Sequence, residues 1–88
     1  MTDKQVAEWM WETVKDGTYF YQEVAVYQII DQFGEEFTYI NENGNRAISK
    51  KVLAEFKKLS ADKVIWERGS RAWRLRTQYD SPGRQQEG

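Results

Sequence analysis

The stretch KVIWERGSRAWRLR, residues 63–76, decides the fold of this chain. Apolar and polar residues alternate on both sides of Gly69-Ser70, which is the pattern of two β-strands joined by a turn. Glycine followed by serine at the centre is the order expected of a type II′ hairpin turn. We therefore predict a C-terminal β-hairpin that turns at these two residues.

The register of this hairpin follows from its centre. Pairing outward from the turn places Trp66 opposite Trp73 and Val64 opposite Leu75 on one face, and the other face then holds Ile65, Glu67, Ala72 and Arg74. A four-residue turn would keep this pairing, whereas a three-residue turn would shift it. We expect the tryptophan face to be the buried one.

An amphipathic helix is predicted at the N-terminus. Thr2 and Gln5 form a capping box, and Gly17 supplies the stop, so this helix covers about residues 3–16. The aromatic run TYFY, residues 18–21, then favours a short strand or an extended bridge.

Two more helices follow in the chain. The second begins at about Gln22 and stops at Gly34, and its apolar stripe consists of Val26, Ile29, Ile30 and Phe33. The third covers residues 49–60 with Ser49 as its N-cap, and its apolar stripe consists of Ile48, Val52, Phe56 and Leu59. Its outer face is basic.

The connection between the second and third helices contains strand formers followed by turn residues. FTYI, residues 37–40, suits a strand. In NENGN, residues 41–45, asparagine and glycine tolerate positive φ, and the asparagine side chains can hydrogen-bond their own backbone. We favour a structural turn. The alternative is a loop that presents amides to a partner or a phosphate, although it lacks the glycines and the GK[ST] ending of a phosphate loop.

Composition predicts a single globular domain. The chain has 88 residues, of which 40% are hydrophobic and 15% aromatic, enough for one core. Its N-terminus has neither a signal-peptide pattern nor an apolar run that would span a membrane. We expect a cytoplasmic protein that does not contact membranes.

The chain has no cysteine and no histidine. Disulfides, thiolate zinc sites and the usual near-neutral base are therefore absent from its chemistry. The adjacent pair Glu35 and Glu36 need not converge, and Glu8 and Glu12 resemble a solvated stripe. We expect no enzymatic activity, no metal and no cofactor.

SKKVLAEFKKL, residues 49–59, followed by VIWERGSRAWRLR resembles the recognition helix and wing of a winged helix-turn-helix domain. The resemblance covers residues 3–77 in the order helix, short strand, helix, connection, helix and hairpin. It implies an α+β winged helix, with three helices and a C-terminal two-stranded β-hairpin wing. The domain would occupy residues 1–78 and be followed by a flexible C-terminal tail, residues 79–88.

The chain is also similar to a narrower family, one of short uncharacterised bacterial proteins that carry FGEEF, YINENGN and a terminal PGRQ. That resemblance implies no activity. The connection from Glu36 to Ile48 is longer than the short turn common in winged helices. This length is a departure from the geometry of standard helix-turn-helix docking.

Charge is distributed unevenly along the chain. Residues 1–45 contain two basic and nine acidic side chains, whereas residues 46–76 contain ten basic and three acidic ones. Such asymmetry is typical of a basic binding face. It is equally compatible with two halves that neutralise each other in the fold.

The first functional hypothesis is binding of double-stranded DNA by the third helix and the wing. Its candidate phosphate contacts are Arg46, Lys50, Lys51, Lys57, Lys58, Arg68 and Arg71. Lysines position a protein on phosphates without reading bases, so any specificity would be modest.

The alternative hypothesis is a protein–protein interaction module without nucleic-acid binding. A homodimer or a foreign protein would contact Trp11, together with Glu8 and Glu12. Trp11 lies off the apolar stripe of the first helix, which consists of Val6, Met10 and Val14. Four tyrosines could also line a pocket, although such residues more commonly complete the core and its rim: Tyr19, Tyr21, Tyr27 and Tyr39.

Overall fold

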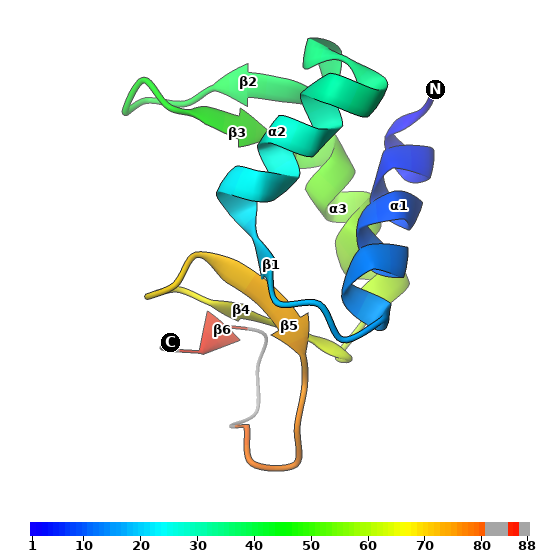
Figure 1. Cartoon of the computed structure of the whole chain (residues 1–88), viewed down its shortest axis with the longest axis vertical. Helices are drawn as coiled ribbons and strands as arrows, with labels where there is room; N and C mark the ends of the chain where they lie inside the picture. Colours follow the sequence, from blue (N-terminus) through cyan, green and yellow to red (C-terminus); the bar gives the residue numbers. More distant parts are fainter. Residues whose placement is uncertain (81–84, 87–88) are drawn as a thin grey trace.

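Three helices and several short strands form the α+β fold that the sequence predicts (Figure 1). The computed structural model describes residues 1–80 and 85–86. The elements in order are α1 (Asp3–Lys15), β1 (Phe20–Tyr21), α2 (Gln22–Phe33), the 3₁₀ turn η1 (Glu35–Phe37), β2 (Thr38–Ile40), β3 (Arg46–Ile48), α3 (Lys50–Ser60), β4 (Val64–Glu67), β5 (Ala72–Leu75) and β6 (Gln85–Gln86).

The predicted caps set the helix boundaries. The Gln5 N–H donates to Thr2 Oγ1 at 3.2 Å, and the Thr2 N–H donates to Gln5 Oε1 at 2.9 Å, which confirms the capping box. Gly17 follows α1 with φ of 93°, and Gly34 ends α2 with φ of 109°, both conformations that favour glycine. At α3, the Lys51 N–H donates to Ser49 Oγ at 3.3 Å.

The NENGN segment is a turn that the Asn41 side chain holds closed. Asn41 Oδ1 accepts hydrogen bonds from the backbone N–H groups of Asn43 and Asn45, both at 3.0 Å. Gly44 has φ of 80°. The turn joins β2 to β3, which pair in antiparallel register, so the segment is the structural turn that the sequence predicts.

The C-terminal hairpin has the predicted register. Trp66 pairs with Trp73 and Val64 with Leu75 across β4 and β5, and β1 pairs with the other edge of β5. The sheet order is β1-β5-β4-β6, with β6 parallel to β4.

The predicted type II′ turn at Gly69-Ser70 is wrong. Residues 68–71 form a four-residue loop, closed by the Arg71 N–H, which donates to the Glu67 carbonyl at 2.8 Å. The positive φ of this loop, 55°, falls on Arg71 and not on Gly69. The register survives because a four-residue loop pairs the same residues as a two-residue turn.

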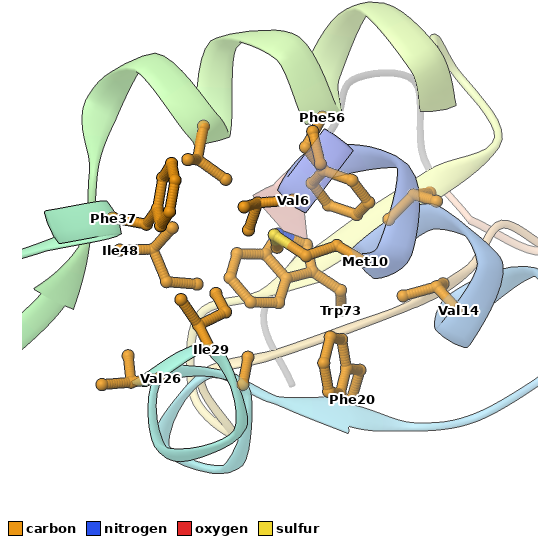
Figure 2. Close-up of a cluster of buried hydrophobic side chains, with 14 residues drawn as sticks. Val6, Met10, Val14, Phe20, Val26, Ile29, Phe37, Ile48, Phe56 and Trp73 are labelled. Atoms are coloured by element: carbon orange, nitrogen blue, oxygen red, sulfur yellow. The ribbon is translucent and has the colours of Figure 1, made fainter. Parts of the chain in front are cut away.

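Trp73 occupies the centre of the core. Its ring lies 4.7 Å from that of Trp66, 5.6 Å from that of Phe56 and 6.3 Å from that of Phe20, measured between centroids. Figure 2 shows the indole between Phe56 of α3 and Phe20 of β1. The hairpin therefore joins α3 to β1 through one side chain.

Both faces of the hairpin are covered, which corrects the expectation of a single buried face. Ile65 and Ala72, on the face opposite the tryptophans, are fully buried. Trp66 and Leu75 are only partly buried against the core.

A flexible tail is predicted for residues 79–88, and the structure describes 79–80 and 85–86 of it. The other tail residues lie outside the described part of the chain, and the flexibility of the tail stays a prediction.

Replacing Trp73 with alanine should cost more stability than replacing Trp66. Trp73 is 5% exposed and fills the core, so Trp73→Ala should lower the free energy of unfolding by about 3–5 kcal/mol. Trp66→Ala removes a partly exposed ring and should cost less. Urea denaturation measures both, with Tyr79→Ala as a control because Tyr79 is 87% exposed. Equal losses at positions 66 and 73 would contradict this core assignment.

Candidate nucleic-acid interface

The lysines of α3 form one exposed face. Lys50, Lys51, Lys57 and Lys58 are all exposed, with exposed Ala54 between them. They lie opposite Val52 and Phe56, which are buried against α1 and the hairpin. The 3.6-residue period explains this separation, because positions i, i+1, i+4, i+7 and i+8 share one side of a helix.

Most of this lysine face lacks carboxylate partners. Lys58 Nζ lies 3.4 Å from Glu55 Oε1, but across residues 1–80 and 85–86 no ion pair within 4.0 Å involves Lys50, Lys51 or Lys57. Lys50 and Lys51 also occupy the first turn of α3, where the helix dipole disfavours cations. Neither a close ion pair nor the helix dipole therefore explains their position.

A hollow beside this end of α3 contains acidic as well as basic groups. Lys50 and Lys51 line it together with Asp3 of α1 and Glu36 of η1. These carboxylates reduce the positive potential at the start of the helix. The C-terminal half, at Lys57, is outside this hollow.

Two of the three arginines predicted to join α3 at the interface line a different groove. Arg71, from the β4–β5 loop, lines a groove with Arg46 and Asn45 of the β2–β3 hairpin and with the start of α2. Lys50 and Lys51, which line the hollow beside α3, do not line this groove. Arg68 is exposed at the hairpin tip. The structure thus places Arg46 and Arg71 along one groove and Lys50 and Lys51 along another hollow.

Arg74 is neutralised within the fold. Its guanidinium makes a bidentate contact with Asp80, with N–O distances of 2.9 and 2.7 Å, and it also pairs with Glu67. The Tyr19 hydroxyl donates to the second oxygen of Glu67. Arg74 therefore adds no free positive charge to the surface.

These contacts shift the pKa values of the groups involved. Arg74 holds the pKa of Asp80 well below its usual range, assisted by the Thr77 N–H, which donates to Asp80 Oδ2 at 2.7 Å. The hydrogen bond from the Tyr19 hydroxyl lowers the pKa of Glu67 most, and the one from Arg74 lowers it further. The bond between Tyr19 and Glu67 also raises the pKa of Tyr19. Each carboxylate is thus stabilised in its charged form.

Asp80→Asn should lower the melting temperature at pH 7, and this deficit should shrink on acidification. A carboxyl whose pKa is depressed by folding stabilises the fold above its unfolded pKa, about 4, and this contribution is lost as pH falls toward the folded pKa. Thermal unfolding followed by circular dichroism from pH 7 to pH 2.5 measures the deficit.

The matched control for this experiment is Asp31→Asn, at an exposed position of α2 that forms no ion pair in the described part of the chain. It should change the melting temperature little. A deficit for Asp80→Asn that is as large at pH 2.5 as at pH 7 would contradict the ion-pair assignment.

The residues predicted for a protein interface do not form one cluster of free side chains. Trp11 is partly buried and packs against the core, so it covers the core edge. Glu8 is exposed, and Glu12 Oε1 lies 3.2 Å from Lys15 Nζ. Contact with another protein through these residues stays a prediction.

The four tyrosines do not converge on one pocket. Tyr19 and Tyr21 contact each other at 5.1 Å between ring centroids, and Tyr21 lines the groove that holds Arg71. Tyr39 lines the hollow at the start of α3. Tyr27, on the outer side of α2, lines neither.

Among the described residues, no group of three or more acidic side chains is arranged to hold a metal ion. None of the helices in that part of the chain combines the length and the apolar character that crossing a bilayer requires.

Comparison with known proteins finds a family match over residues 2–75, to the family described as "Family of unknown function (DUF6953)". The chain belongs to DUF6953. No curated protein and no solved structure matches this DUF6953 chain. The match supports an uncharacterised domain, as the narrower sequence resemblance implies, and it assigns no activity.

Proposed function

We propose that this DUF6953 domain binds double-stranded DNA through the lysine face of α3. The observation that carries the proposal is that Lys50, Lys51 and Lys57 share one exposed face and have no ion-pair partner among residues 1–80 and 85–86. Unpaired lysines on a rigid helix can replace the counterions of DNA phosphates at little structural cost.

The arrangement of the elements supports a winged-helix mode of docking. The order of helices and strands, together with β1 beside β5 and β5 beside β4, is the order that a winged helix needs. In that mode α3 enters the major groove, and the β4–β5 hairpin, with Arg68 exposed at its tip, flanks it.

The chemistry of the face predicts weak sequence preference. Lysines contact phosphates, and among the exposed α3 residues only Ala54 offers an apolar contact to a thymine methyl group. The β2–β3 hairpin stands where many winged helices have a short turn, so the approach of α3 to the groove would differ from the standard geometry.

The salt dependence of DNA binding tests the proposal. Affinity for a 20-base-pair duplex, measured by fluorescence anisotropy between 25 and 200 mM KCl, should fall steeply as salt rises. Lys57→Gln should weaken binding and reduce the slope of log K against log salt concentration by about one unit.

Lys15→Gln is the matched control, because Lys15 is exposed on α1 and pairs with Glu12. It should leave both the affinity and the slope nearly unchanged. Absence of binding at 25 mM KCl, or an equal effect of the two substitutions, would refute the α3 interface.

A further inference from the structure

A groove between the two hairpins is separate from the lysine face of α3. It encloses about 540 Å³ and is lined by three segments: the first turns of α2, the β2–β3 turn and the β4–β5 loop. Figure 1 shows the two hairpins projecting to the same side of the molecule with the start of α2 between them. Residues distant in sequence thus meet around one hollow.

One wall of this groove is apolar and uncovered. Tyr21 is 49% exposed and Val24 is 45% exposed, and both line the groove. Val26 continues the apolar wall inward and is buried. Solvent-exposed apolar surface of this kind is stabilised when a partner covers it.

Two arginines from different hairpins complete the lining. In the chain as described, neither Arg46 nor Arg71 has a carboxylate within 4.0 Å, and Arg46 Nη1 donates only to Thr38 Oγ1, at 3.0 Å. Asn45 and Ser70 add polar groups beside them. Guanidinium groups in such positions are suited to bidentate contacts with carboxylates.

We infer that this groove binds an extended acidic peptide in which an apolar side chain lies between carboxylates. The carboxylates would pair with Arg46 and Arg71, and the apolar side chain would cover Val24 and Tyr21. A polyphosphate fits less well, because it would leave the apolar surface of Val24 and Tyr21 uncovered and because the Glu23 carboxylate would repel its denser charge more strongly than the spaced carboxylates of a peptide. This site uses other residues than the proposed DNA interface.

The test is an NMR titration of the ¹⁵N-labelled protein with the peptide acetyl-Asp-Leu-Glu-Phe-Asp-amide. Saturable shifts are expected at the backbone amides of residues 22–26, 45–46 and 70–71. The uncharged peptide acetyl-Asn-Leu-Gln-Phe-Asn-amide should bind about tenfold more weakly, because it loses the charge-assisted hydrogen bonds.

Substitutions distinguish the contribution of the groove residues from that of neighbouring residues. Arg46→Gln and Arg71→Gln should each weaken binding of the acidic peptide about tenfold. Arg68→Gln is the matched control, since Arg68 belongs to the same loop but does not line the groove, and it should have little effect.

Three results with the peptides would overturn the inference: no saturable shift up to about 5 mM acidic peptide, equal binding of the two peptides, or an equal loss with Arg68→Gln and Arg71→Gln. Shifts of the same amides by a single-stranded oligonucleotide in place of the peptide would also overturn it. Because Lys57→Gln tests the DNA interface and Arg71→Gln tests the groove, failure of one proposal is distinguishable from failure of the other.

Discussion

Trp73 is the contact on which the remaining structure depends. Its side chain meets Trp66 across the hairpin, Phe56 on α3 and Phe20 on β1. Because side chains alternate between the faces of a strand, a slip of one residue would turn this indole away from the core and bring a charged neighbour inward. The tryptophan pair thus fixes which side of α3 faces the core, and the lysines consequently face water.

The same pairing builds the groove between the hairpins. β1 is held at the edge of β5, and the Gln22 N–H at the start of α2 donates to the Arg71 carbonyl at 2.9 Å. This hydrogen bond fixes the β4–β5 loop beside α2, while β3 packs against α2 from the other hairpin. Two cationic regions, one on α3 and one in the groove, therefore depend on one arrangement of the sheet.

Local patterns were enough to predict the helix boundaries and the hairpin register, because caps, glycines and alternation act within a few residues. They failed where distant segments decide the outcome. The positive φ at Arg71 accompanies loop closure onto Glu67 and a contact with Gln22, which outweigh the local preference of Gly69. Likewise, the lysine face follows from periodicity alone, whereas the groove needs three segments that only the fold brings together.

The most direct test of this account is a nuclear Overhauser spectrum of the aromatic side chains. It should show cross-peaks between the indole protons of Trp66 and Trp73, and between Trp73 and the rings of Phe20 and Phe56. Cross-strand peaks that instead join Trp66 to Ala72 or Arg74 directly opposite it would show a shifted register. That result would contradict the buried face of the hairpin and, with it, the outward orientation of the α3 lysines.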